Sequence, residues 1–364
     1  MSEDAVSNRE GLSILILFMI GTASVIVPGI AVAKRDMWLA VIIAVSAALL
    51  VALVCARLHY ILHGKDLFGM LEFCYGKFVG RCICLLYWWF FLHAAVLVSM
   101  DITEFIKIVS FESTPYIALN GSIVFLGIFV AREGLVVLGR WSKFFIGLII
   151  FLILITTLML VPEMDIDNIT PVLYDGISPV IGGAFVIFSF PLTQLVPFVA
   201  IFGNLKTKRS SYRIYLPGIL IAGSILLVVV TANMLILGPE VASSLFFPSH
   251  DSVKRLHLGT SIQRLEIIAD GIFVLGGFVM FSSYLIACSK AITKTFGFKD
   301  YKFIALPIGL LIINFTRFLN EGFIDHLMFV KTWPTYSFPF QVIFPILFWI
   351  TAEIKTRRKV NAIK

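Results

Sequence analysis

The sequence contains little charge. Asp, Glu, Lys and Arg make up only 14% of its 364 residues, whereas hydrophobic residues make up 59%. Soluble globular domains carry about 25% charged residues, and disordered chains are poor in hydrophobic residues. The composition therefore excludes both classes and is typical of a chain embedded in a membrane.

The sequence also lacks the residue patterns of a metal or catalytic centre. It has five cysteines, and Cys82-x-Cys84 has no His or second Cys pair at metal-binding spacing. We interpret the cysteines as packing residues. Gly76-x-x-x-Gly80 does not lie in a phosphate-loop or dinucleotide-binding context. The sequence therefore predicts a protein that is not an enzyme and that has no cofactor and no metal site.

Apolar stretches near the length of a membrane span occur throughout the chain. A transmembrane helix needs about 20 predominantly apolar residues. We expect ten spans, at residues 12–33, 38–56, 82–100, 116–130, 144–161, 179–202, 214–237, 267–288, 303–318 and 338–351. No polar segment of domain size accompanies them. The sequence therefore predicts a single polytopic membrane domain over residues 1–364.

The Lys and Arg residues indicate how the spans are oriented, because basic residues concentrate in the loops on the cytoplasmic side. With the N-terminus inside, most of the 29 Lys and Arg residues lie in inner segments, whereas the outer loop 163–175 has acidic residues and no Lys or Arg. Residues 1–11 lack the basic start and cleavage site of a signal peptide, so the first span is expected to remain. We expect both termini inside, and the net charge of +7 requires no nucleic-acid partner.

Two of the apolar stretches are interrupted near their middle. Gly21-Thr22-Ala23-Ser24 and Pro28-Gly29 interrupt the first stretch, and Ser189-Phe190-Pro191-Leu192-Thr193 interrupts the sixth. In lipid, unwound backbone survives only where it lines a cavity or meets a ligand. Paired breaks at corresponding places in two halves point to a small-molecule site near the membrane midplane.

The breaks also divide the chain into two halves of five spans. Repeat one covers about residues 12–161 and repeat two about residues 179–351. An odd number of spans in each half gives the halves opposite orientations, as in an inverted-topology repeat. The sequence therefore predicts an all-α integral membrane fold with a 5+5 inverted repeat, in which helices 1 and 6 are broken.

Small and polar residues at the first break suggest a ligand site. Gly21, Thr22, Ala23 and Ser24 would offer backbone N–H groups and two hydroxyls. The start of the following half-helix would attract an anionic group such as a carboxylate. The alternative is that these small residues only allow close helix packing. The second break in the other half favours ligand binding.

The second break has both apolar and polar candidates. Pro191 lacks a backbone N–H and frees an upstream carbonyl. Thr193 and Gln194 supply uncharged polar groups, and Phe190 would cover the apolar part of a small ligand. A proline kink patched by Thr193 is the alternative. Gln194 favours binding, because an amide at membrane depth requires a partner.

Ionisable residues within the spans are few, and each is a functional hypothesis. Asp270 lies one turn into the eighth span, and we predict a gating or coupling role for it. The alternative is a solvated ion pair with Arg264 or Lys254. His93 lies in the third span among aromatic residues, and packing is the preferred interpretation of this histidine.

Two connecting segments are long enough to hold structure. Residues 63–80, on the inside, mix apolar and charged positions at helical spacing, which suggests an interfacial helix. Residues 238–264, on the outside, carry Phe246-Phe247-Pro248 among polar residues. This pattern is consistent with a lid over the bundle and also with an ordered connector.

Several motifs of the second half follow one another in a recognisable order. Gly238-Pro239-Glu240, Phe247-Pro248 and Gln263-Arg264-Leu265-Glu266 lie in the outer loop and at the start of the eighth span, and Asn168-x-x-Pro171-Val172-Leu173 precedes the sixth span. On a ten-span chain this order resembles the B subunits of the nutrient germination receptors of bacterial endospores. That family belongs to the amino acid–polyamine–organocation transporter superfamily.

The resemblance implies a LeuT-like fold in which helices 1, 3, 6 and 8 surround the site. It implies a location in the inner spore membrane, an A-type membrane subunit and a C-type lipoprotein as partners, and an amino acid or similar nutrient as the ligand. Phe190-Pro191 fits the family, whereas Thr193 and Gln194 stand where the family often has Gly and Glu, which argues against a carboxylate ion site. The function expected is nutrient sensing, with an amino acid permease of the same fold as the alternative.

Overall fold

The computed structural model describes residues 6–256, 265–319 and 323–363, and the regular structure of these residues is entirely helical. The α-helices are α1 (Asn8–Ile20), α2 (Ala23–Ile26), α3 (Ile30–Ala33), α4 (Met37–Ile61), α5 (Leu67–Val109), α6 (Tyr116–Glu133), α7 (Leu135–Leu160), α8 (Ile177–Ile187), α9 (Val196–Ile201), α10 (Ser210–Leu237), α11 (Pro239–Ser244), α12 (Pro248–Lys254), α13 (Glu266–Phe296), α14 (Tyr301–Leu319), α15 (Phe323–Phe338) and α16 (Phe344–Ile363).

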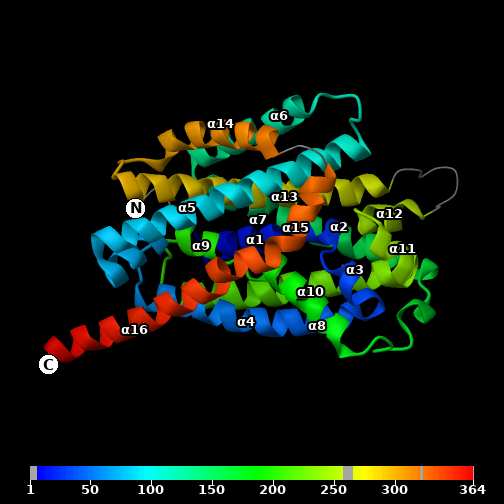
Figure 1. The fold of residues 1–364 in the computed structure, drawn as a ribbon, viewed down its shortest axis with the longest axis horizontal. Coiled ribbons are helices and arrows are strands. Elements are labelled where there is room, and N and C mark those ends of the chain that lie inside the picture. The colour runs from blue at the N-terminus through cyan, green and yellow to red at the C-terminus, as the bar shows by residue number, and fades with distance from the viewer. Residues whose placement is uncertain (1–5, 257–264, 320–322, 364) are drawn as a thin grey trace.

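Ten helical stretches of the described residues are long and apolar enough to cross a membrane, which confirms the predicted number. They are Asn8–Ile26, Ile30–Ile61, Leu67–Val109, Tyr116–Glu133, Leu135–Glu163, Ile177–Ile201, Ser210–Leu237, Glu266–Phe296, Tyr301–Leu319 and Phe329–Arg358. Most run roughly along the long axis of the molecule (Figure 1). Every predicted span overlaps one of them, although the tenth begins well before residue 338. The chain is an integral, multi-pass membrane protein.

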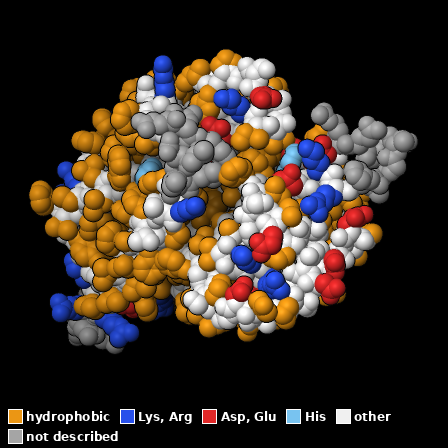
Figure 2. Space-filling view, turned by 45° about the vertical axis from the view of Figure 1, so that its right-hand side comes forward, with side chains coloured by type: hydrophobic (Ala, Val, Ile, Leu, Met, Phe, Trp, Pro, Cys, Tyr) orange, Lys and Arg blue, Asp and Glu red, His pale blue; other side chains and the backbone are white. Residues whose placement is uncertain are grey.

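The outer surface of the bundle is apolar. Large side chains such as Phe129 and Phe144 are 61% and 77% exposed, respectively. Figure 2 shows hydrophobic side chains covering much of the side of the molecule, whereas charged side chains gather toward its ends. In water such a surface would be an aggregation hazard, but it matches the hydrocarbon core of a bilayer.

Helix α1 lies at the centre of the bundle. Every residue from Ser13 to Ile20 is buried, and α1 packs against α7, α10 and α13. In a membrane a helix that is hydrophobic on all sides can face lipid or protein, and the burial of α1 shows that protein surrounds it. The first half of span 1 is therefore a core element.

The two ends of the bundle carry different structures. The start of α1 and the end of α16 lie at one end, which we call the inner end following the predicted topology, and α11 and α12 lie at the opposite, outer end (Figure 1). At the inner end, α5 begins with a short segment that bends at Gly76, whose φ of 80° is left-handed. The turn at Gly76 separates residues 67–75, which belong to the segment expected to form an interfacial helix, from the rest of span 3.

Candidate functional site

Span 1 loses its regular helix twice. Helix α1 ends at Ile20, and α2 starts only at Ala23. After Ile26 the chain passes through Val27 and Gly29, both with positive φ, before α3 begins at Ile30. The backbone between Ile20 and Ile30 is therefore only intermittently helical.

Span 6 is interrupted by a π-helical segment. Helix α8 ends at Ile187, and in the segment Phe188–Leu192 the residue Phe190 has extended dihedral angles, with φ −146° and ψ 114°. Thr193 compensates for the disturbed hydrogen bonding, because both its N–H and its hydroxyl donate to the Phe188 carbonyl. Helix α9 then begins at Val196.

A cavity of about 80 Å³ lies beside both interruptions. Its walls come from spans 1, 3, 6 and 8, from the segment before α12 and from α15. Ile26 ends span 1, Pro28 lies between spans 1 and 2, and Phe190 and Gln194 belong to span 6. The lining is mostly apolar and includes Ala94, Leu97, Val98, Val186, Phe246, Phe247 and Val330, and the acidic residue Asp101 of span 3 also lines the cavity.

Three residues that line this cavity carry buried polar atoms without partners among the described residues. The Gln194 Oε1, the Tyr284 hydroxyl and the Trp333 Nε1 are buried, and none has a hydrogen-bond partner among the described residues. Leaving a buried polar group unpaired costs about 1–3 kcal/mol. Three such groups around one cavity are what a site built for a polar ligand would present.

The structure places the residues of the first break mostly in packing contacts. A Cβ on Gly21 would lie 2.3 Å from the carbonyl carbon of Gly276, so span 1 meets the backbone of span 8 here. Thr22 is buried, and its hydroxyl lies 3.6 Å from the Met280 sulfur. Ala23 is fully buried. These three contacts fit the packing alternative.

Ser24 is connected to the outer end of the bundle. Its carbonyl accepts a hydrogen bond from the Ser249 hydroxyl, and the Asn233 amide donates to Ser249 at 2.7 Å. Ser24, Asn233 and Ser249 also line a second, smaller cavity of about 50 Å³. The carbonyl freed in span 1 is therefore used to hold α12.

The residues of the second break lie partly at the cavity. Phe190 and Gln194 line it, whereas Pro191 is buried and the Thr193 hydroxyl oxygen lies 2.9 Å from the Gln341 Oε1. Thr193 thus joins span 6 to span 10. Of the residues predicted for ligand binding, Phe190 and Gln194 are brought together in one cavity, and the role of the whole set remains a prediction.

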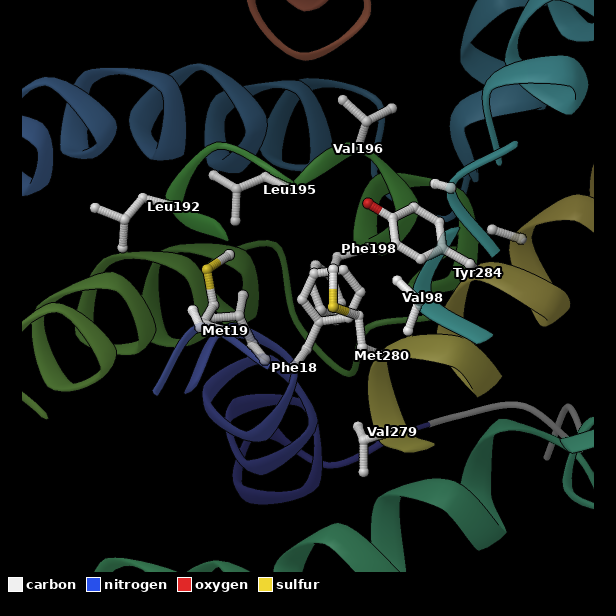
Figure 3. Close-up of a cluster of buried hydrophobic side chains, with 14 of the residues drawn as sticks. Phe18, Met19, Val98, Leu192, Leu195, Val196, Phe198, Val279, Met280 and Tyr284 are labelled. Carbon is white, nitrogen blue, oxygen red and sulfur yellow. The ribbon is translucent and has the colours of Figure 1, made fainter. Parts of the chain in front are cut away.

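The cavity is closed on its inner side by aromatic rings. The ring of Phe18 lies 4.8 Å from that of Phe198 and 5.3 Å from that of Tyr284, centroid to centroid. Figure 3 shows Phe18, Phe198, Met280 and Tyr284 converging from spans 1, 6 and 8. This cluster fills the space between the broken spans and separates the cavity from the inner end.

The segment before α12 covers the cavity on its outer side. Phe246 and Phe247, just before α12, line the cavity. The ring of Phe247 packs against Phe105 of span 3 at 4.9 Å and against Phe273 of span 8 at 6.3 Å. The segment is therefore packed onto the bundle as a lid. Gln263 and Arg264 of the same loop lie outside the described residues.

Asp270 is paired with a residue that sequence reasoning did not consider. The Nδ1 of His250 on α12 lies 2.7 Å from the Asp270 Oδ1 on span 8, and the two side chains are only 12% and 15% exposed. The hydrogen bond and charge of Asp270 raise the pKa of His250, with a smaller contribution from Asp251, whereas burial and Lys254 oppose the shift. Of the two partners expected from the sequence, Arg264 lies outside the described residues, and among the described residues the ion pair of Asp270 is with His250 rather than with Lys254.

His93 packs among aromatic rings, as its neighbours in the sequence suggested. Its ring lies 4.8 Å from that of Phe329 and 5.2 Å from that of Tyr336. Sequence reasoning missed Trp333, because the predicted tenth span began after it. The signal that would have found it is Trp333-Pro334, an aromatic residue beside a helix-disturbing proline.

The chain is similar to known proteins over most of its length. A family model described as "Spore germination protein" matches residues 5–324. The chain is 26% identical over 371 residues to Spore germination protein KB of Bacillus subtilis (strain 168), and the match covers 99% of this chain and 97% of that protein.

Two solved transporters share the arrangement of helices. Mhp1, a nucleobase-cation-symport-1 family transporter in a closed conformation with bromovinylhydantoin bound, has a TM-score of 0.69 at 12% identity, covering 91% of this chain and 75% of Mhp1. MhsT in complex with L-phenylalanine has a TM-score of 0.65 at 13% identity, covering 97% of this chain and 89% of MhsT. At these identities the likeness establishes the fold alone, which is the predicted LeuT-like fold.

Proposed function

This chain belongs to the family of spore germination proteins, and from that premise we propose that it is the nutrient-sensing membrane subunit of a spore germination receptor. The observation that carries the proposal is the cavity beside the interrupted spans, whose mostly apolar lining includes three residues with polar atoms that are unpartnered among the described residues. We propose that the germinant binds there, at Phe190 and Gln194, and that the other residues of the two breaks shape the site.

The size and chemistry of the cavity support a small ligand. One water needs about 10–15 Å³ on this measure, so a cavity of about 80 Å³ holds a molecule of only a few heavy atoms. An amino acid with a short apolar side chain fits these limits. Its polar groups would bond to Gln194, Tyr284 and Trp333, and its side chain would contact Phe190.

Signalling would follow from two states of the bundle. A ligand shifts such an equilibrium only if it binds one state more tightly than the other. Closure around the ligand joins spans 1 and 8 through α12, and we propose that A-type and C-type receptor subunits detect this change. We place the protein in the inner spore membrane with both termini on the inner side. If this protein does not co-purify with those two subunits, the proposed assembly is wrong.

A second candidate function is an amino acid permease. The likeness to two transporters favours it, because the fold permits alternating access. Uptake of a labelled nutrient into membrane vesicles separates the two functions. Saturable uptake would favour the permease, whereas binding without uptake would favour the receptor.

The proposed site is tested by removing the Gln194 amide. Gln194→Leu keeps a side chain of similar size and should raise the nutrient concentration for half-maximal germination about 2- to 10-fold, because one neutral hydrogen bond contributes about 0.5–1.5 kcal/mol. The measurement is the fall in optical density of a spore suspension across a nutrient series. Asn314→Leu, which removes an exposed amide from span 9, is the control. Equal curves for Gln194→Leu and wild type would contradict the assignment.

The His250–Asp270 pair predicts a pH-dependent lid. Because the pKa of His250 is raised in the closed lid, the stability that the pair contributes is complete below the ordinary histidine pKa of about 6.5 and is lost as pH rises through the raised value. The closed lid should therefore be less stable, and spores should respond more slowly, at alkaline pH than at pH 6.

Asp270→Asn should remove this dependence, because it keeps the shape and deletes the charge. The rates at pH 6 and pH 9 should then become similar. Asp251→Asn, on the same helix as His250 but without the contact, should keep most of the wild-type pH dependence. A full pH dependence in Asp270→Asn would mean that the pair does not control the lid.

A further inference from the structure

A larger hollow, at the inner end of the bundle, is lined by lysines. It measures about 610 Å³ and lies between the loop before α5, the end of α9, the end of α13 and the start of α14. Lys290 and Lys294 lie one turn apart on α13, Lys299 follows that helix, and Lys65 lies on the opposite wall. This hollow lies away from the cavity between the broken spans.

One of the four lysines is held by contacts within the protein, and the other three are available to bind an anion. The Nζ of Lys290 donates to the Ile201 carbonyl at 3.3 Å and lies 5.1 Å from the centre of the Tyr301 ring. Within the described parts of the chain, no ion pair joins Lys65, Lys294 or Lys299 to a carboxylate. The hollow therefore presents three lysines that have no ion-pair partner among the described residues.

Two carboxylates complete the lining. Asp66 and Glu72 lie on the wall opposite α13, and an Asp66 oxygen accepts the Gly69 N–H at 2.8 Å. With four lysines against two carboxylates, the hollow attracts an anion overall. The carboxylates can accept hydrogen bonds from hydroxyl groups attached to that anion.

Exposed aromatic rings lie at the edge of the hollow. Phe298 lines it and is 52% exposed, and the neighbouring Phe296 is 64% exposed. Their rings lie 6.3 Å apart. Apolar rings beside lysines at the end of a membrane span match the boundary between acyl chains and phosphates. A free anion in the aqueous phase would make no favourable contact with these rings.

We propose that this hollow binds the headgroup of an anionic phospholipid of the inner leaflet, with the chemistry of phosphatidylglycerol. The phosphodiester would contact Lys65, Lys294 and Lys299, and the glycerol hydroxyls would donate to Asp66 and Glu72. The acyl chains would lie against the exposed phenylalanines. Because spans 6 and 8 supply both this hollow and the ligand cavity, the lipid would stabilise the closed inner end.

The experiment measures unfolding of the full-length protein in detergent with added lipid. Phosphatidylglycerol should raise the unfolding midpoint, whereas phosphatidylcholine with the same acyl chains and inorganic phosphate should not. Lys294→Gln combined with Lys299→Gln should weaken the lipid effect about thirty-fold in concentration, because each lysine near an anionic headgroup contributes about a factor of five.

The control removes two charges from the same end of the bundle. Lys206 and Lys208 are exposed in the loop between α9 and α10 and do not line the hollow, so Lys206→Gln with Lys208→Gln should leave the lipid effect unchanged. The midpoint without lipid should be the same for all variants, which excludes a folding defect. Equal effects of the two lipids, an equal loss in the control, or full competition by inorganic phosphate would each overturn the proposal. The germination response is not needed for this test.

Discussion

Gly21→Val is expected to remove most of the folded protein from the membrane. A Cβ on Gly21 would lie 2.3 Å from the carbonyl carbon of Gly276 and 2.7 Å from the backbone nitrogen of Gly277. Backbone atoms of a packed helix cannot rotate away as a flexible side chain can, so spans 1 and 8 would have to separate. We expect a loss of stability of about 3 kcal/mol or more. Protein abundance in membranes and the unfolding midpoint in detergent measure it.

Gly121→Val is the matched control for this prediction. Gly121 lies in span 4, and a Cβ there would have no heavy atom within 4 Å apart from its own helix backbone. The same valine should therefore leave abundance and midpoint close to wild type. If Gly21→Val accumulated to wild-type levels with an unchanged midpoint, spans 1 and 8 would not be in contact as described.

The ten spans could be predicted because a bilayer imposes a length and a composition on every crossing helix. The ends of the spans were less predictable, since some helices continue beyond the apolar core. Span 10 begins at Phe329 rather than near residue 338, and span 5 begins at Leu135 rather than near residue 144. These extensions carry polar or helix-disturbing residues such as Pro334, which a search for apolar runs excludes.

The roles of the residues at the breaks could be predicted only in part. In the sequence, a small residue such as Gly21 is consistent both with an exposed backbone and with close helix packing. The contact that shows close packing is with Gly276, far away in the sequence. Similarly, the partner of Asp270 is His250, because α12 folds back over the bundle. Residues brought together by tertiary packing leave no local pattern in the sequence.

The composition of the cavity wall is the largest difference from the expectation. The resemblance led us to expect helices 1, 3, 6 and 8 around the site, and the structure adds Trp333 of span 10. Trp333 stacks on Phe90, with ring centroids 5.7 Å apart. Thr193 also bonds to Gln341 of the same span. Span 10 is therefore connected both to the cavity and to the second break.

Ala94→Leu is expected to abolish the response to nutrient without removing the protein. Ala94 is 2% exposed, lies on span 3 and lines the cavity. The leucine adds three carbon atoms to a cavity of about 80 Å³, so little room would remain for a ligand. Spores carrying this variant should fail to germinate at nutrient concentrations that saturate wild type, while the protein stays detectable in spore membranes. Ala118→Leu, at an exposed position of span 4, should respond normally.

Val98→Leu tests whether the loss of response comes from filling the cavity or from damage to the fold. Val98 lines the same cavity on the same span, but this change adds only one carbon atom, which cores tolerate better. It should shift the nutrient dose curve to higher concentration and leave the maximal response intact. If the ligand is excluded sterically from one site, the response to nutrient should be weakened in Val98→Leu and absent in Ala94→Leu, while both proteins are equally abundant. If Ala94→Leu spores responded as wild type does, the germinant would bind elsewhere and this cavity would not be the sensor.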